Sequence, residues 1–185
     1  GLQEDLRSLN RFGFGNTFEL KIFTMDTNAY AHFDSGSVEH SLLFGVDYST
    51  SESKIVSGFS FAAPLDVFAP VYGSSVPDLF IYGNVNQPID QLGIYVQDQM
   101  KFASRWIATL ALRQDSTDIT PDNRLSDSQV DQSDSALTGR VALTYLAESG
   151  LAPYFSYSTS FLPVAGVDFY NRPFDPTEGE QFEAG

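Results

Sequence analysis

The sequence contains no cysteine, few basic residues and no long apolar run. The lack of cysteine among its 185 residues excludes a disulfide framework, a thiol nucleophile and a Cys-ligated metal site. Only 10 Lys and Arg stand against 24 Asp and Glu, for a formal net charge of −14, so nucleic acid is not an expected partner. No window approaches the roughly 18 consecutive apolar residues of a membrane helix, and no secretory leader is visible. Any membrane role must therefore be carried by β-strands.

The residues that are present favour extended structure. Apolar residues make up 42% of the sequence, aromatic residues 14% and charged residues 18%, a composition that argues against disorder. The sequence starts at Gly1 without an initiator Met and stops at Gly185 inside a strand-like run. We therefore interpret residues 1–185 as part of a β-barrel domain, with other parts of the protein absent.

Apolar and polar residues alternate along several segments, and this alternation predicts six to seven antiparallel strands. Short turns at 34–37, 101–105 and 147–150 join these strands into hairpins. Registers that pair Phe33 with Val38 and Met100 with Trp106 place the apolar residues of each hairpin on one face. The predicted strands cover residues 28–33 (starting as early as Thr17), 38–50, 91–100, 106–115, 136–146 and 152–161, with a further strand from about 180.

Long polar connections separate the hairpins. The first, from 51 to about 89, is interrupted by Pro and Gly. The second, 115–134, carries a concentration of Asp with only Arg124 to offset it and reads as a solvated loop, and the third runs from 162 to about 177. Short turns on one rim and long loops on the other, joined by strands of about 9 to 11 residues, are typical of a transmembrane β-barrel.

In such a barrel the polar face lines a wet lumen, which explains Gln97, Arg140 and Ser158 in mid-strand. Aromatic residues near the short turns fit an interfacial girdle. Asp98 falls on the lipid face, so we place it near the short-turn rim, in the headgroup region. A soluble sandwich or jelly roll is the alternative, because its strands also alternate.

Several motifs together resemble the barrel of TonB-dependent ferric-siderophore receptors, the group that contains the ferrichrome transporter. They cover residues 38–48, 70–73, 93–99, 153–161 and 174–185. The resemblance implies a barrel of 22 strands plugged by an N-terminal domain, in line with the plugged lumen of such transporters. The plug and the TonB-contacting segment are not in this sequence.

The resemblance also implies a function. The parent protein would capture a ferric siderophore at the outer mouth and pass it inward with energy transmitted through TonB. The expected location is the outer membrane of a Gram-negative bacterium, with lipid, TonB and the ferric siderophore as partners, and no covalently bound cofactor is expected. The short turns would face the periplasm and the long loops the outside.

Three other functions remain open. A passive porin-like channel would share the wall but lack the plug. TonB-dependent uptake of another cargo, such as a different metal chelate or cobalamin, keeps the family. An outer-membrane hydrolase finds little support, because the two His are both rim residues and share no pocket with a nucleophile, so we expect no enzyme.

Ligand contacts are expected from aromatic side chains and from two cations. Aromatic surface suits a bulky chelate, and the guanidinium groups would favour an anionic one; loop self-packing and lumen solvation are the competing interpretation. The candidates are Phe59, Phe61, Tyr72, Phe80, Tyr82, Arg113 and Arg140.

No metal site is predicted. His32 and His40 fall on opposite faces near a turn. The acidic segment 115–134 lacks the spacing of a calcium-binding loop.

Overall fold

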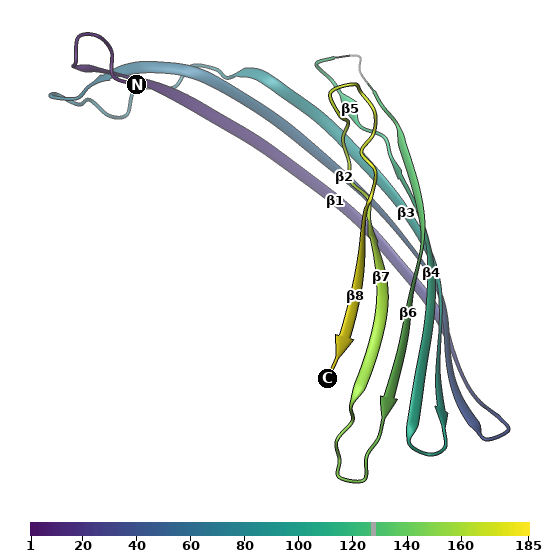
Figure 1. The fold of residues 1–185 in the computed structure, drawn as a ribbon. Coiled ribbons are helices and arrows are strands. Elements are labelled where there is room, and N and C mark those ends of the chain that lie inside the picture. Colours follow the sequence, from purple (N-terminus) through teal and green to yellow (C-terminus); the bar gives the residue numbers. More distant parts are fainter. Residues whose placement is uncertain (127–128) are drawn as a thin grey trace. The chain divides into compact units, whose positions relative to one another are not determined.

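The fold, given by a computed structural model that describes residues 1–126 and 129–185, consists of strands. The sheet order is β1-β2-β3-β4-β6-β7-β8, with the two-residue β5 paired to β3 (Figure 1). The pairings β3–β4, β4–β6, β6–β7 and β7–β8 are antiparallel. The strand bounds are β1 Ser8–Ser35, β2 Val38–Asp66, β3 Phe80–Phe102, β4 Trp106–Ile119, β5 Asp122–Asn123, β6 Gln132–Tyr145, β7 Tyr154–Leu162 and β8 Thr177–Ala184. Within the described residues, no helix is long and apolar enough to cross a membrane.

The chain divides into two compact units. Unit 1 comprises Gly1–Lys21, Glu52–Pro88 and Pro121–Gln129. Unit 2 comprises Ile22–Ser51, Ile89–Thr120 and Val130–Gly185. Unit 1 therefore holds those parts of β1, β2 and β3 that are remote from the short turns, together with β5.

The three short turns of unit 2 join the predicted hairpins, but two predicted registers are wrong by two residues. Phe102, not Met100, pairs with Trp106. In the first hairpin the turn is only Gly36-Ser37, with Gly36 at a φ of +64°, and the Phe33 ring stacks on His40 at 4.9 Å. A shift of two residues keeps every side chain on its predicted face, because side chains alternate with a period of two.

The exposure pattern of unit 2 is the reverse of that of a soluble protein. Leu110, Leu112 and Val141 lie on one face and are 46%, 54% and 54% exposed. The opposite face keeps Asp115 and Thr117 at 5% and 1% exposure. A soluble sandwich would bury its apolar face against a second sheet, whereas the described strands all belong to one sheet. The sandwich alternative is therefore not supported.

The first long connection is much shorter than predicted. β2 continues to Asp66 and β3 begins at Phe80, so most of 51–89 is strand and only residues 67–79 connect the two. The Pro and Gly residues suggested a loop. Pro64 and Pro88 nevertheless lie within β2 and β3, since proline is tolerated where its missing N–H leaves no ladder bond unmade.

The predicted solvated acidic loop at 115–134 is also partly strand. β4 extends to Ile119 and β6 starts at Gln132. Asp118 accepts a hydrogen bond from Ser133 Oγ at 2.6 Å, and Asp115 is buried, so neither is a free loop carboxylate. Asp127, also assigned to this loop, lies outside the described residues. The third connection, between Leu162 and Thr177, is confirmed.

Asp98 finds a partner that the sequence did not reveal. Its Oδ2 lies 2.7 Å from Nδ1 of His40, and the two side chains are 24% and 17% exposed. His32 instead lies with its Nδ1 3.2 Å from Ser41 Oγ. The two histidines thus make separate contacts, and no cluster of His, Cys, Asp or Glu suited to a metal ion occurs in the part of the chain that the structure describes.

Candidate functional site

Unit 1 carries a group of aromatic side chains from three adjacent strands, which we call the aromatic cluster. The ring centroids of Phe59 lie 5.7 Å from Phe61, 5.7 Å from Phe80 and 6.0 Å from Tyr82. Phe12 joins them through Phe61 at 5.4 Å. These separations are those of attractive edge-to-face and tilted pairs. The cluster consists of Phe12, Phe14, Phe59, Phe61, Phe80 and Tyr82.

The local sequence explains why the rings gather on one face. Phe12 and Phe14 alternate along β1 with Gly13 between them, and Phe59 and Phe61 alternate along β2 around the buried Ser60. Residues two apart in a strand share a face. At Gly13 a Cβ atom would lie 2.6 Å from Val76 Cγ1, so the lack of a side chain lets the 67–79 connection approach the strand.

The aromatic cluster leaves an open hollow of about 470 Å³. Four aromatic side chains line it, from Phe12, Phe14, Phe59 and Tyr82, with no charged group among the lining residues that the structure describes. Phe14 is 74% exposed and Phe12 50% exposed, so the rings present apolar carbon to the outside rather than a sealed core. Exposed apolar patches mark contacts with ligands, other proteins or membranes.

Four of the predicted ligand-contacting residues, Phe59, Phe61, Phe80 and Tyr82, are therefore brought together, although on strands rather than on a loop. Tyr72 lies in the 67–79 connection, is 75% exposed and has no ring contact within the described residues. Sequence reasoning missed Phe12 and Phe14, because the first strand was started too late. The alternation Phe12-Gly13-Phe14-Gly15 was the signal that could have found them.

Unit 2 carries the other two candidates, Arg113 on β4 and Arg140 on β6, and they differ sharply. Arg113 donates to both oxygens of Asp47, with Nη1 2.5 Å from Oδ2 and Nη2 3.0 Å from Oδ1. It also donates to Asp115, with Nη2 2.6 Å from Oδ1 and Nε 2.8 Å from Oδ2. Two carboxylates thus compensate one guanidinium through charge-assisted hydrogen bonds.

Tyr95 extends this polar group, which we call the Arg113 network. Its hydroxyl donates to Asp26 Oδ2 at 3.0 Å, and its ring lies 5.8 Å from Arg113 Cζ. Gln91 Nε2 donates to Asp115 Oδ1 at 3.2 Å. The network joins four strands and consists of Asp26, Asp47, Gln91, Tyr95, Arg113 and Asp115.

Two glycines make room for the Arg113 network. A Cβ at Gly45 would overlap the Tyr95 ring, and a Cβ at Gly93 would overlap the Arg113 guanidinium. Both glycines are buried. Glycine is therefore needed here so that long side chains from neighbouring strands can lie flat across the sheet.

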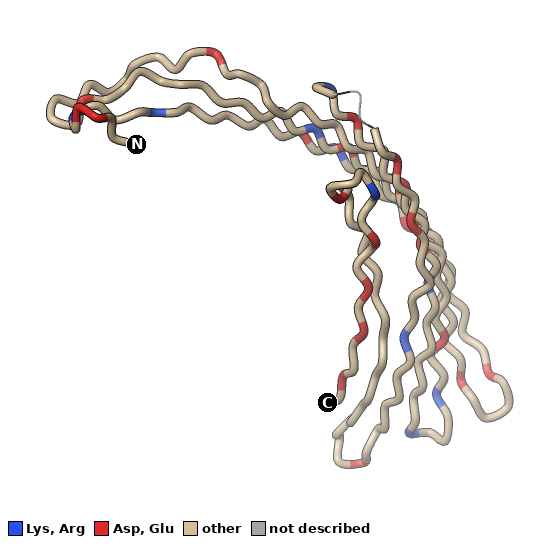
Figure 2. Tube along the Cα trace, turned by 45° about the horizontal axis from the view of Figure 1, so that its top comes forward, with Lys and Arg blue, Asp and Glu red and all other residues tan. Residues whose placement is uncertain are grey.

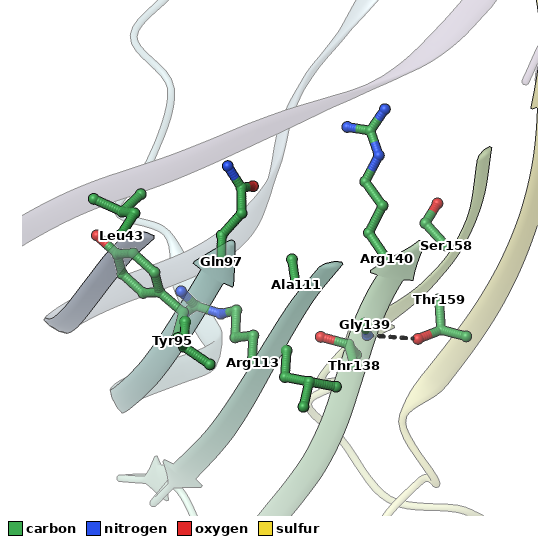
Figure 3. Close-up of a pocket in the computed structure, with 12 residues that line it drawn as sticks. Leu43, Tyr95, Gln97, Ala111, Arg113, Thr138, Gly139, Arg140, Ser158 and Thr159 are labelled. Atoms are coloured by element: carbon green, nitrogen blue, oxygen red, sulfur yellow. Dashed lines mark hydrogen bonds between the residues drawn. The ribbon is translucent and has the colours of Figure 1, made fainter. Parts of the chain in front are cut away.

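A cavity of about 340 Å³ borders Arg113, Gln97, Thr138 and Ser158, with apolar side chains such as Leu112 also in its lining. Arg140 projects from β6 beside it (Figure 3). Unlike that of Arg113, its side chain forms no hydrogen bond or ion pair with any described residue, and the residue is exposed. Thr159 Oγ1 accepts a hydrogen bond from Gly139 N at 3.0 Å and so closes one side of the cavity (Figure 3).

These features define a class of protein. A single antiparallel sheet that exposes apolar side chains on one face and keeps a charged network on the other is typical of the wall of a transmembrane β-barrel. The chain belongs to the family described as TonB dependent receptor-like, beta-barrel, whose model matches residues 3–185. The predicted all-β barrel wall and the outer-membrane location in a Gram-negative bacterium are confirmed by this membership.

Two curated relatives support the same family assignment. The chain is 34% identical to the ferrioxamine B receptor of Salmonella typhimurium strain SL1344 over 96% of its own length and 25% of that protein. It is 32% identical to the ferrichrome outer membrane transporter/phage receptor of Escherichia coli K12, over 90% of this chain and 23% of the relative. These relatives are transport receptors, not enzymes. The chain thus spans about a quarter of the length of the relatives it matches.

A solved structure supports the fold. The siderophore receptor PiuA from Acinetobacter baumannii superposes with a TM-score of 0.76 at 19% identity, over 92% of this chain and 29% of PiuA. At that identity the likeness concerns the barrel architecture alone.

Proposed function

We propose that this chain forms part of the barrel wall of a TonB-dependent outer-membrane receptor that takes up a ferric siderophore. Its relatives are named for ferrioxamine and ferrichrome, and each is about four times as long as the matched segment. In this proposal residues 1–185 are a partial β-barrel domain, completed by further strands and by a plug that contacts TonB. The wall itself contacts outer-membrane lipid through its exposed apolar face.

The aromatic cluster carries the proposal. A bulky chelate needs a broad apolar surface, and the rings from β1, β2 and β3 offer one beside a hollow of about 470 Å³. The cluster lies on those parts of the three strands that are remote from the short turns. β1 has 28 residues, far more than the roughly 9–11 that cross a bilayer. We assign this surplus to the outside, where the ligand arrives.

The remaining candidates take different roles. Tyr72, exposed in the 67–79 connection, supplies a further aromatic contact. Arg140 is a cation without a partner among the described residues and is available to a polar group of the ligand. Arg113 is compensated by Asp47 and Asp115 and holds strands together rather than binding ligand. The protein acts as a transporter without catalysis and without a covalently bound cofactor.

The test measures ligand binding by the intact receptor in outer-membrane vesicles, using radioactive iron chelates. Phe59→Ala combined with Tyr82→Ala removes two lining rings, so we expect the Kd to rise at least about tenfold. Phe68→Ala is the matched control: Phe68 lies in the same unit, is 77% exposed and does not line the hollow, and its removal should leave the Kd unchanged. Equal binding by the double variant and the control would refute the assignment of the site.

Uptake separates an active receptor from a passive channel. Iron uptake by cells that carry the receptor should stop when TonB is deleted, while vesicle binding persists. Uptake that continues unchanged without TonB would favour the porin-like alternative. Binding of cobalamin, without binding of any iron chelate, would favour the alternative that the receptor takes up a different cargo.

A further inference from the structure

We propose that Gln132 is a positioning residue for ligand capture. Its side chain clamps the β7–β8 connection, residues 163–176, against the sheet and so presents two aromatic side chains, Phe169 and Tyr170, in one fixed orientation. The inference rests on the proposed function and adds to it a second contact surface, in unit 2. Gln132 acts through the connection and does not itself touch the ligand.

Three side chains at one end of the β4–β6 pair are almost completely covered. Ile119, Thr117 and Gln132 are 2%, 1% and 6% exposed, although the described strands form one sheet. Ile119 pairs with Gln132 in the ladder, and Thr117 pairs with Asp134. Directly paired residues share a face of the sheet, so one element covers all of them. The hydrogen bonds of Gln132 identify that element as the β7–β8 connection.

Gln132 joins the two limbs of the β7–β8 connection. Its side-chain nitrogen Nε2 donates to the carbonyl oxygen of Val164 at 3.2 Å and to that of Phe174 at 3.0 Å. The same nitrogen donates to Asp134 Oδ2 at 2.7 Å, which orients the amide. Val164 lies just after β7 and Phe174 shortly before β8, so one buried amide fastens both limbs to the start of β6. An apolar replacement would leave all three acceptors without this donor.

The connection covers the polar face of the sheet. In the unbroken β4–β6 ladder Gln132 pairs with Ile119, which lies an even number of residues along β4 from Arg113. An even separation places two side chains of a strand on the same face. Gln132 therefore shares a face with the Arg113 network, and in a transmembrane barrel the polar face looks into the lumen. The limbs of the connection thus lie on the side of the wall that a transported ligand passes.

The tip of the β7–β8 connection is held by its own hydrogen bonds and still exposes its rings. Asp168 Oδ1 accepts from the backbone N–H groups of Tyr170 at 2.8 Å and Arg172 at 3.0 Å. The Phe169 and Tyr170 rings meet edge to face at 5.4 Å, and Arg172 Cζ lies 5.3 Å from the Tyr170 ring. Phe169 is nevertheless 93% exposed and Tyr170 74% exposed. Ordered aromatic side chains that stay uncovered are suited to contact with a bulky ligand.

The tip offers ring surface rather than free charge. Acidic positions recur along the strands while Lys and Arg are sparse (Figure 2). Arg172 is the one basic residue between β7 and β8, and its Nη2 lies 2.7 Å from Asp168 Oδ2. Because that guanidinium is compensated locally, we expect the tip to contact a ligand through the rings of Phe169 and Tyr170.

The first test measures ligand binding by the intact receptor in outer-membrane vesicles. The probe is whichever of three radioactive chelates, a ferric trishydroxamate, a ferric triscatecholate or ferric citrate, the wild type binds most tightly. Gln132→Met keeps the length of the side chain but removes its donors, so the tip occupies the binding orientation for only part of the time. We expect the Kd to rise about three- to tenfold.

Gln114→Met is the matched control for Gln132→Met. The Gln114 amide donates to a single acceptor, the neighbouring backbone oxygen of Asp115, at 3.1 Å, and holds no limb of the connection. Its replacement should leave the Kd unchanged. Equal Kd values for Gln132→Met and Gln114→Met would overturn the inference.

A double-mutant cycle separates positioning from a general loss of stability. Phe169→Ala combined with Tyr170→Ala removes the tip rings and should raise the Kd about three- to tenfold in the wild-type background. Added to Gln132→Met, the same pair should raise the Kd less than about twofold further, because an unclamped tip already contributes little. Effects that multiply in full would overturn the inference. An unchanged Kd for the tip variant alone, which alters only exposed side chains, would overturn it even if Gln132→Met failed to fold.

A rescue variant tests whether hydrogen bonds position the connection. In Gln132→Lys the ammonium group supplies three donors for the carbonyl oxygens of Val164 and Phe174 and for Asp134 Oδ2. We expect its Kd to return to within about twofold of the wild type. A Kd as high as that of Gln132→Met would overturn the role of the clamp. A wild-type receptor that binds none of the three chelates would instead refute the proposed function itself.

Discussion

The aromatic cluster of unit 1 and the Arg113 network of unit 2 are built on the same sheet with opposite chemistry. In the aromatic cluster, side chains touch through ring contacts of 5.4 to 6.0 Å and leave apolar carbon facing outward. In the Arg113 network, every nitrogen of one guanidinium donates to a carboxylate. Covering the exposed rings with a ligand would remove apolar surface from water and lower the free energy of the system. The Arg113 network offers no comparable gain to a ligand.

This difference follows from how each kind of group is satisfied. A buried charge is tolerated only when its hydrogen-bonding capacity is filled, so the Arg113 network is complete without a ligand. Apolar rings have no hydrogen bonds to satisfy, so the only cost of their partial exposure is the hydration of their surface. They therefore stay available to a ligand. We propose that the Arg113 network is structural and that the aromatic cluster is the ligand surface, and the predictions below test that division.

The largest effect is expected from removal of the central cation. Arg113→Met leaves Asp47 and the 5%-exposed Asp115 facing each other without compensation. We expect the free energy of unfolding of the intact receptor to fall by about 2–3 kcal/mol, less than for a fully buried pair because Arg113 is partly exposed. Thermal unfolding in detergent measures the loss.

Arg140→Met is the matched control, because Arg140 lies beside the same cavity without a partner in the described chain. Its effect should stay within about 0.5 kcal/mol. If the two variants unfold at the same temperature, the Arg113 network is not structural and the comparison fails.

A smaller effect is expected at Gly45, where the lack of a side chain leaves room for the Tyr95 ring. Gly45→Ala places a methyl group against the Tyr95 ring and displaces it from Asp26. We expect a loss of about 1–2 kcal/mol, as for other overpacked sites. Gly83→Ala is the comparison, since its new methyl carbon would lie 3.4 Å from Ser57 Cβ, an ordinary van der Waals contact. A Gly45→Ala variant as stable as Gly83→Ala would show that the ring moves aside freely.

The aromatic cluster should contribute little to stability. Phe59→Leu removes ring contacts but keeps an apolar side chain at a half-exposed position, so we expect a loss of about 0.5–1 kcal/mol in unfolding free energy. A stability loss as large as that of Arg113→Met would show that the rings are a packed core rather than a binding surface.

The faces of the strands were predictable from the sequence, and the registers were not. Side chains alternate with a period of two, so Leu110, Leu112 and Arg113 were assigned to the correct sides. The register depends on the turn instead. Gly36 adopts a positive φ, which allows a turn of only two residues where a longer one was expected. The error of two residues in each of two hairpins left every face unchanged.

Strand length and cross-strand partners were beyond sequence reasoning. Pro64, Pro88 and the Asp-rich segment were read as loop signals, yet β2 and β4 run through to Asp66 and Ile119 because neighbouring strands supply hydrogen bonds and charge partners. The aromatic residues of β2 and β3 were predicted as ligand contacts by their chemical type alone, and the structure places them together. That they meet Phe12 and Phe14 of β1 required knowledge of strand adjacency, which lies in the tertiary fold.

The smallest effect concerns a polar group at the surface, in the connection between β7 and β8. Hydrogen bonds from the backbone N–H and side chain of Arg172 lower the pKa of Asp168 from its ordinary value of 3.8. A lowered pKa means that the carboxylate stabilises the folded connection at neutral pH and that this contribution is lost as the pH falls below about 4. Amide hydrogen exchange at Tyr170 and Arg172, corrected for its intrinsic pH dependence, should accelerate modestly there in the wild type and already at neutral pH in Asp168→Asn. Because Asp168 is exposed, Asp168→Asn should reduce stability far less than Arg113→Met does. Equal losses of stability would show that burial does not determine how much a polar contact contributes in this chain.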